Sequence, residues 1–187
     1  KSSEQVAQEM AYLSSRYDTT RFRLVDNIID MKYVENLFGV FARERRDLDV
    51  FIETKSNLQK NQIRLLATGG VKCMQPGLES LSQAQLRAMD KGVTPIQNLV
   101  CLKWCYYYRV AVSWNILLGF PGETNEDYLR QIDLLPSLFH LQPPEGAGKF
   151  WLERFSPYYA RPQEYGVRIT GPGLAYPHVY DSRQVDL

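Results

Sequence analysis

A glycine- and proline-rich elbow is the part of this sequence best suited to hold a ligand. The apolar run Asn115–Leu118 leads into Gly119-Phe120-Pro121-Gly122, and Thr124 with Asp127 has the spacing of a helix N-terminal capping box. Glycine lets a backbone approach a ligand closely, and proline fixes the direction of the corner. The pattern predicts a strand-to-helix turn that can cradle a ligand, although many parallel sheets contain such turns for packing alone.

Polar residues alternate with apolar residues along the other strand-like runs, so one face of each run carries the polar groups. We assign the bulky residues of each run to the side that faces helices. The residues that then point inward are Glu53, Lys55 and Asn57 in the second run, Gln75, Gly77 and Glu79 in the third, and Ser113, Asn115, Leu117 and Gly119 in the fourth. The first run ends in Asp26-Asn27, and the last run contains Glu153 and Arg154. Buried charges are costly unless a partner or ligand compensates them. We therefore expect a polar cavity at the strand ends, with exposed and merely solvated strand ends as the alternative.

The cysteines and histidines do not form a recognisable catalytic or metal-binding set. Cys101 and Cys105 are four residues apart on a helical pattern, but no third ligand follows at close spacing. Free cysteine is among the most buried residue types, so the spacing favours helix packing. His140 and His178 lie outside the strand ends. The sequence therefore predicts no metal site within this chain.

Strand-like runs alternate with helical patterns, which is typical of an α/β fold with a parallel sheet. A helical pattern through Val6, Met10 and Leu13 opens the chain. The predicted strands are Phe22–Asn27, Asp49–Asn57, Cys73–Ser80, Val112–Phe120 and Trp151–Ser156, and the predicted helices are Met31–Arg46, Leu58–Thr68, Gln83–Lys91, Pro95–Tyr108 and Asn125–Leu135.

The amino-acid composition changes toward the end of the chain. Residues 142–148 are rich in proline and glycine and predict a long loop before the last strand. We expect a partial parallel (β/α) barrel over residues 1–156 and an irregular extension, rich in tyrosine and proline, over residues 157–187.

Two of these segments resemble motifs of the radical S-adenosylmethionine (radical SAM) enzymes. The segment Asn115–Thr124 is similar to their fifth-strand motif, where the strand holds the adenine, and Gln75–Ser80 is similar to their fourth strand, where a polar pair approaches the ribose and methionine part. Lys55 and Asn57 lie where the third strand supplies polar contacts, and Asp26-Asn27 lies where the second strand receives the amino group. The resemblance implies cofactor contacts at Asp26, Asn27, Lys55, Asn57, Gln75, Glu79, Ser80, Asn115, Leu117, Gly119, Phe120 and Pro121.

Taken over nearly the whole chain, the pattern is most similar to cobalamin-associated radical SAM proteins that mature ribosomally made peptides. The resemblance implies S-adenosylmethionine, a 4Fe-4S cluster and cobalamin as cofactors, a precursor peptide as substrate and an external electron donor. It also implies a 5'-deoxyadenosyl radical that modifies the peptide, for example by C-methylation.

One departure from the family is large. The family binds its cluster through Cys-x-x-x-Cys-x-x-Cys after the first strand, whereas no cysteine precedes Cys73 here. We expect the cluster loop and any cobalamin domain to lie upstream of Lys1, and the chain by itself to be inactive. The alternatives are a transfer-RNA methylthiotransferase-like enzyme, which shares the Gly-Phe-Pro-Gly-Glu-Thr elbow, and a peptide-binding domain that has lost its cluster.

Composition excludes several other classes. Lys and Arg number 22 against 21 Asp and Glu, and a formal net charge of +1 does not favour a nucleic-acid partner. No apolar run reaches the length of about 18 residues that a membrane helix needs, and there is no signal-peptide pattern. Only three of the 187 residues are cysteine, which is typical of proteins in a reducing compartment. We therefore expect a cytoplasmic protein without a membrane partner.

Overall fold

The computed structural model describes residues 1–173 and 175–180. It divides into two compact units, residues 1–149 and the residues from 150 onward. The predicted domain boundary, after residue 156, lies a few residues beyond this division. All elements of the candidate site belong to the first unit.

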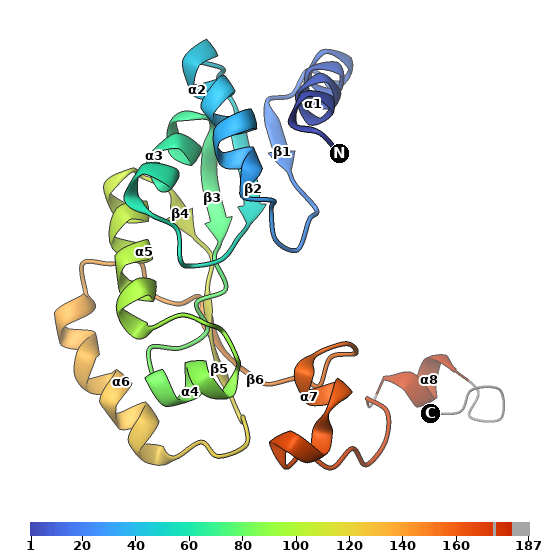
Figure 1. The fold of residues 1–187 in the computed structure, drawn as a ribbon, viewed down its shortest axis with the longest axis vertical. Helices are drawn as coiled ribbons and strands as arrows, with labels where there is room; N and C mark the ends of the chain where they lie inside the picture. The colour runs from blue at the N-terminus through green and yellow to red at the C-terminus, as the bar shows by residue number, and fades with distance from the viewer. Residues whose placement is uncertain (174, 181–187) are drawn as a thin grey trace. The chain divides into compact units, whose positions relative to one another are not determined.

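The first unit is built on four parallel strands that are adjacent in sequence order (Figure 1). Each pairs in parallel with its neighbour, and helical segments connect successive strands. The predicted α/β fold with a parallel sheet is therefore confirmed. The strands are β1 (Arg21–Arg23), β2 (Asp49–Glu53), β3 (Val71–Gln75) and β4 (Ala111–Val112).

The predicted helices are present, with small differences at their ends. A π-helical turn, η1, opens the segment predicted as Met31–Arg46. The helices of the first unit are α1 (Ser3–Tyr17), η1 (Val34–Phe38), α2 (Gly39–Glu44), α3 (Lys60–Thr68), α4 (Gln83–Ala88), α5 (Pro95–Tyr107) and α6 (Asn125–Leu138).

Two further strands form a small parallel pair, β5 (Asn115–Leu118) and β6 (Gly146–Lys149), joined through α6. The predicted strand Val112–Phe120 is therefore divided between β4 and β5. A parallel bridge between Glu79 and Ile116 connects the segment after β3 to β5. This bridge places the end of β3 beside the strand that leads into the elbow.

The last strand was predicted in the wrong place. Trp151–Ser156 forms no strand, whereas Gly146–Lys149, which the proline and glycine content predicted to be loop, pairs with β5. A segment rich in glycine is predicted to be a loop because it lacks an apolar pattern. The hydrogen bonds that pair two strands join backbone groups, however, so glycines can form them. Glu153 and Arg154, which fall on the wrongly predicted strand, are exposed.

The side chain of Gln142 completes the edge of β4. Its amide Nε2–H donates to the Val110 carbonyl at 2.9 Å, and its Oε1 accepts from the Val112 N–H at 2.9 Å. The indole N–H of Trp114 also donates to the Gln142 carbonyl at 3.1 Å. One primary amide thus satisfies a donor of β4 and the carbonyl of the residue directly before it, as a neighbouring strand would.

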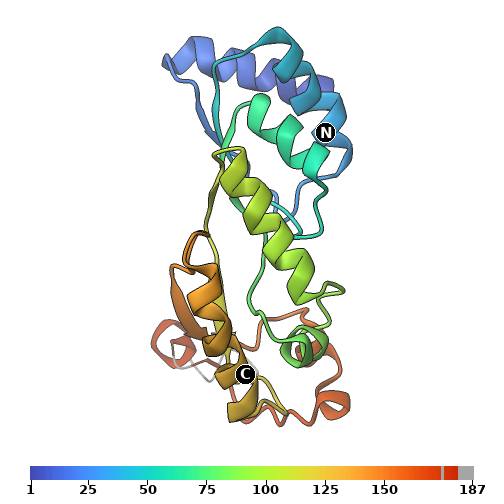
Figure 2. The ribbon, with the colours of Figure 1, turned by 90° about the vertical axis from the view of Figure 1, so that its left-hand side faces the viewer.

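Helices α3 and α5 cover one face of the four-stranded sheet (Figure 2). The residues beneath them, such as Val50, Ile52 and Met74, are fully buried. The alternation of buried and accessible residues along β2 matches the predicted faces. Gly69 is required where α3 meets η1, because an added Cβ would lie 2.4 Å from the Phe38 carbonyl oxygen.

The second unit contains short helices among irregular segments, namely α7 (Pro157–Ala160), η2 (Pro162–Tyr165) and α8 (Tyr176–Val179). The rings of Tyr158 and Tyr165 stack with centroids 4.3 Å apart. Among the helices that the structure describes, none has the length and apolar character needed to cross a bilayer.

Candidate functional site

A polar cavity of about 310 Å³ lies at the carboxyl ends of β2 and β3. It brings together four residues that the sequence predicted as cofactor contacts: Asn27, Lys55, Gln75 and Glu79. Glu53, Gly77, Asp90 and Lys91 also line it. These eight residues are called the strand-end site below. Parallel strands bring their carboxyl ends to one edge, which explains why residues so distant in sequence meet here.

Glu79 is the most constrained member of the strand-end site. Its backbone adopts the left-handed conformation (φ +59°), and its carboxylate pairs with the Lys91 ammonium at 2.5 Å. Both side chains are about one quarter exposed, 26% for Glu79 and 28% for Lys91. The Glu79 carbonyl accepts from the Leu117 N–H at 3.0 Å. Glu79 is thus held from both β5 and the loop after α4.

Sequence reasoning missed Lys91. Lys91 is the last residue of the predicted helix Gln83–Lys91, and the available signal was the glycine directly after it, which marks a turn at this point. Gly92 has φ +65°, which allows the turn that carries Lys91 back over β3.

Ser80 points away from the strand-end site. Its hydroxyl is fully buried and donates to the Gln85 side chain at 2.6 Å, and it accepts from the Ser82 N–H at 2.9 Å. The Gln131 Oε1 lies 3.2 Å from the same hydroxyl. The chain turns tightly at Glu79, where the Ser80 N–H donates to the Leu78 carbonyl at 2.7 Å, so Glu79 lines the strand-end site while Ser80 is buried among side chains of α4 and α6. The structure does not place Ser80 with the other predicted contacts.

The buried amides around Ser80 join the end of β3 to three helices. Gln131 of α6 accepts from the Leu81 N–H at 2.7 Å and donates to Gln85 of α4 at 3.0 Å. Asn98 of α5 donates to the carbonyls of Leu78 and Ser80 at 3.0 and 2.9 Å. This amide network fixes the chain on either side of Glu79. Asn98 Oδ1 is a buried acceptor that has no partner among the described residues.

The elbow after β5 is held by the Glu123 carboxylate. Glu123 Oε2 accepts from the Gly119 N–H at 2.6 Å and from the Tyr128 hydroxyl at 2.5 Å. Burial, together with Glu123, raises the pKa of Tyr128 to about 12. Gly119 has φ +92°, and nothing lies within 4 Å of the position that an added Cβ would take. The elbow is therefore fixed from the helix side and open beside Gly119.

The predicted capping box of α6 is confirmed. The Thr124 hydroxyl accepts from the Asp127 N–H, and the Asp127 carboxylate accepts from the Thr124 N–H at 3.1 Å. Hydrogen bonds from Thr124 and then Ser82 lower the pKa of Asp127. In the same elbow, Phe120 is buried while Pro121 is exposed.

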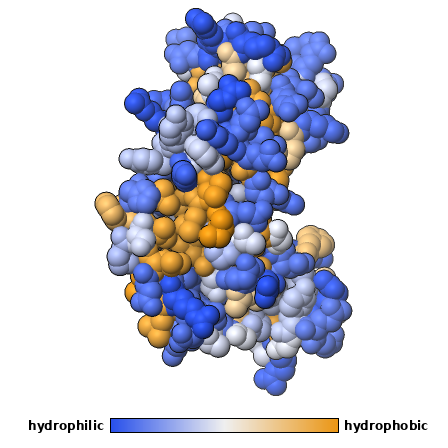
Figure 3. Space-filling view, turned by 60° about the vertical axis from the view of Figure 1, so that its left-hand side comes forward, coloured by the Kyte–Doolittle hydropathy of each residue, from blue (hydrophilic) through white to orange (hydrophobic). Residues whose placement is uncertain are grey.

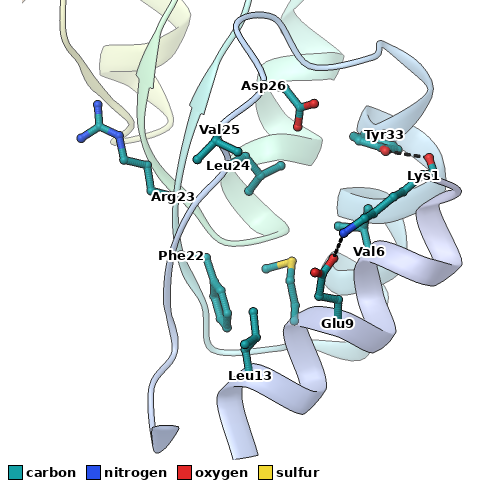
Figure 4. Close-up of a pocket in the computed structure, with 11 residues that line it drawn as sticks. Lys1, Val6, Glu9, Leu13, Phe22, Arg23, Leu24, Val25, Asp26 and Tyr33 are labelled. Atoms are coloured by element: carbon teal, nitrogen blue, oxygen red, sulfur yellow. Dashed lines mark hydrogen bonds and ion pairs between the residues drawn. The ribbon is translucent and has the colours of Figure 1, made fainter. Parts of the chain in front are cut away.

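The remaining predicted contacts lie in three different surroundings. Asn115 and Leu117 alternate with the residues of β5 that face α6, and Asn115 Oδ1 lies 3.9 Å from the position of a Cβ added to Gly146. Asn57 is exposed and does not line the strand-end site. Asp26 lines a separate cavity of about 370 Å³ between α1 and the loop after β1 (Figure 4). The structure therefore separates Asp26 and Asn57 from the strand-end site.

Cys101 and Cys105 have the predicted packing role. Both are fully buried on α5, and the Cys105 thiol lies 3.7 Å from the Met74 sulfur. The neighbouring Cys101 thiol and burial raise the pKa of Cys105. Within the part of the chain that the structure describes, no group of three His, Cys, Asp or Glu residues is arranged to hold a metal ion. The described residues therefore do not fit an iron-sulfur cluster.

The strand-end site does fit the polar part of S-adenosylmethionine. Its lysines can pair with a carboxylate, Glu79 can pair with an ammonium or sulfonium group, and the amides of Asn27 and Gln75 can bond hydroxyls. A volume of about 310 Å³ is within the range of small-molecule sites. Contact between these residues and the cofactor stays a prediction.

Known proteins resemble this chain in sequence and, separately, in fold. No protein-family model matches the chain. An uncharacterized methyltransferase of Pyrococcus horikoshii is 21% identical over 157 residues, which cover 79% of this chain and 34% of that protein. A tRNA-2-methylthio-N(6)-dimethylallyladenosine synthase of Sulfurihydrogenibium is 39% identical over 61 residues, covering 31% of this chain and 14% of that protein.

Two solved enzymes share the architecture. The cobalamin-dependent S-adenosylmethionine radical enzyme OxsB superposes with a TM-score of 0.64 at 12% identity, covering 88% of this chain and 26% of OxsB. The radical S-adenosylmethionine methyltransferase TsrM from Kitasatospora setae superposes with a TM-score of 0.65 at 17% identity, covering 80% of this chain and 30% of TsrM. The chain thus spans about a third or less of each of these four proteins. The chain shares the fold of these radical SAM enzymes, so the predicted resemblance is confirmed at the level of the fold.

Proposed function

We propose that this chain is the S-adenosylmethionine-binding part of a radical SAM enzyme that modifies a ribosomally made peptide by C-methylation. The observation that carries the proposal is the strand-end site, because it gathers Asn27, Lys55, Gln75 and Glu79 in one cavity on a radical SAM fold. The similarity to a methyltransferase and the solved methyltransferase TsrM support methyl transfer. The peptide substrate rests on the sequence resemblance.

The residues of this chain would bind and orient the cofactor. Glu79 and Lys91 offer the charges for its zwitterionic methionine part, and the open side of Gly119 offers room for its adenine. Reductive cleavage of S-adenosylmethionine would supply the radical that takes a hydrogen atom from the substrate, with the electron coming from a cluster held outside the described residues. The role of this chain is therefore positioning, and no histidine or other general base is required of it.

The direct test uses the full-length protein, reconstituted anaerobically with iron and sulfide. We expect 5'-deoxyadenosine to form when strong reductant and S-adenosylmethionine are added, and methyl-labelled cofactor to label a peptide substrate. A full-length protein that holds a cluster but neither binds nor cleaves S-adenosylmethionine would contradict the proposal. A full-length protein without any cluster would favour the peptide-binding alternative.

A second candidate is modification of transfer RNA. The similarity to the methylthio-adenosine synthase is the observation in its favour, although it covers only 31% of this chain. The formal net charge of this chain is +1, so it lacks the excess of positive charge that attracts the RNA backbone. Label that enters transfer RNA, and not peptide, would select this candidate.

A further inference from the structure

The strand-end site carries one net negative charge. Its lining holds three carboxylates, Glu53, Glu79 and Asp90, and two ammonium groups, Lys55 and Lys91. Glu79 and Lys91 already form an ion pair at 2.5 Å. Among the described residues, no hydrogen bond or ion pair reaches the side chains of Glu53, Asp90 and Lys55. Two carboxylates and one ammonium group of the site are therefore free to meet a ligand.

Glu53 is the free carboxylate whose position is best fixed. It ends β2, where its carbonyl accepts from the Ile29 N–H at 2.9 Å and it pairs in register with Gln75 of β3. The preceding Ile52 is fully buried, so alternation directs Glu53 into the cavity, where it is half-buried. Asp90 is exposed in the turn after α4. A half-buried charge without a partner is costly, so a cation would stabilise Glu53 more than Asp90.

The cofactor and its demethylated product differ in charge at one atom. The methionine part of S-adenosylmethionine carries a carboxylate and an ammonium group, which cancel, and its sulfonium adds one positive charge. S-adenosylhomocysteine lacks the methyl group, so its sulfur is a neutral thioether. The Glu79–Lys91 pair is neutral and complements the methionine part of either molecule. Only the sulfonium is complemented by one further negative charge.

We propose that Glu53 faces the sulfonium and makes the strand-end site selective for S-adenosylmethionine over S-adenosylhomocysteine. This inference rests on the proposed cofactor binding and deepens it, because it names the residue that recognises the positive charge. The resemblance to radical SAM motifs implied contacts at Asn27 and Lys55 but none at Glu53. The attraction between unlike charges is stronger where water is partly excluded. The product, without its positive charge, loses this attraction and leaves the site more easily.

The test compares the two ligands on the full-length protein with its cluster reconstituted. Each ligand is titrated by isothermal titration calorimetry without reductant, so that the cofactor stays intact. We expect S-adenosylmethionine to bind at least about tenfold more tightly than S-adenosylhomocysteine, the scale of one interaction with a charged group. Glu53→Gln keeps the shape of the side chain and removes its charge. It should weaken binding of S-adenosylmethionine by about tenfold and that of S-adenosylhomocysteine by less than about twofold.

Asp49→Asn is the matched control. It removes the same charge from the other end of the same strand, where Asp49 pairs with Arg21 at 3.5 Å on the surface. A strand rises about 3.3 Å per residue, which places Asp49 about 13 Å from Glu53 along β2. Both affinities should stay within about twofold of those of the unchanged protein, because salt screens exposed charges at this distance. A loss of preference as large as that of Glu53→Gln would overturn the proposal.

A second measurement needs no variant and keeps the test valid if Glu53→Gln does not fold. Sinefungin has a carbon that bears an ammonium group in place of the methylated sulfur, so it keeps a positive charge at this position. It should bind the unchanged protein more tightly than S-adenosylhomocysteine does, with an affinity closer to that of S-adenosylmethionine. Equal affinities for sinefungin and S-adenosylhomocysteine would overturn the proposal.

The remaining outcomes separate this inference from the proposed function. Equal affinities of the unchanged protein for cofactor and product, or equal weakening of both by Glu53→Gln, would overturn the role of Glu53 and leave the radical SAM assignment standing. Loss of the preference in Asp90→Asn but not in Glu53→Gln would also overturn it, in favour of the other free carboxylate. If the reconstituted protein binds none of these ligands, the proposed function fails together with the inference.

Discussion

Glu79 and Ser80 are adjacent in sequence but face opposite sides, so substituting each should affect a different property. Ser80→Ala removes a fully buried hydroxyl from the amide network. Gln85 and Gln131 keep their bonds to each other and to Leu81, but the Ser82 N–H loses its acceptor. One buried donor left unsatisfied costs about 1–3 kcal/mol of the free energy of unfolding.

This cost can be converted into a measurable shift. For a chain of this size, 1 kcal/mol corresponds to about 2–4 °C in the melting temperature. Ser80→Ala should therefore lower the melting temperature by about 2–12 °C, followed by circular dichroism. Affinity for S-adenosylmethionine in the full-length protein should change less than about twofold, because the hydroxyl points into the helix layer.

Glu79→Gln should behave in the opposite way. It preserves shape and removes a charge from an ion pair that is about one quarter exposed, so its cost in stability is below about 1 kcal/mol. If the carboxylate binds the cofactor, affinity measured by isothermal titration should fall by about 5- to 150-fold, equivalent to about 1–3 kcal/mol. Unchanged affinity for Glu79→Gln, or a larger loss for Ser80→Ala, would refute the assignment of the two faces.

Three further predictions follow from the elbow, from β4 and from the cap of α6. In the full-length enzyme, Gly119→Val should abolish cleavage of S-adenosylmethionine while the iron-sulfur absorbance persists, since φ is +92° and the side chain would enter the open space. Leu118→Val, on the side facing α6, should keep 5'-deoxyadenosine production and lower the free energy of unfolding by about 1 kcal/mol. Gln142→Leu should destabilise the chain in urea by about 1–3 kcal/mol, because it removes the partners of the Val112 N–H and the Val110 carbonyl, and an unchanged midpoint would contradict this role. The lowered pKa of Asp127 means that its stabilising contribution is present above its ordinary value of 3.8 and is lost as the pH falls through the lowered pKa. Asp127→Asn should therefore reduce the fall in stability on acidification, and an identical acid profile would argue against this linkage.

The sequence predicted the parallel α/β fold well because its signals are local. Capping residues and proline at Thr94-Pro95 mark the start of α5, and alternation along β2 marks the buried face. The position of β6 could not be predicted in this way, since Gly146 and Gly148 carry no side chains whose pattern could signal a strand. Its pairing depends on β5, which is distant in sequence.

The strand-end site was predicted in part for the same reason. Faces follow from alternation, so Lys55, Gln75 and Glu79 were placed on the accessible side. Ser80 was grouped with Glu79 by resemblance, although the tight turn at Glu79 leaves it buried among side chains of α4 and α6. Asp26 could not be separated from Asn27 without the path of the loop that follows β1, and Lys91 depends on the turn after α4.

The packing of α6 has a consequence for the motions of the chain. Its apolar face, including Ile132 and Leu135, looks onto a cavity of about 430 Å³ opposite Trp114 and Ile116, and hydrophobic residues gather in a broad patch on this side (Figure 3). Ile132 remains 56% exposed, and Pro136 removes one backbone hydrogen bond from the helix. A helix with few buried apolar contacts opens at a small free-energy cost. The hydrogen bonds of Gln131 thus hold α6 in place locally. We expect the backbone amides of α6 to exchange their hydrogens well before those of β5 and β6.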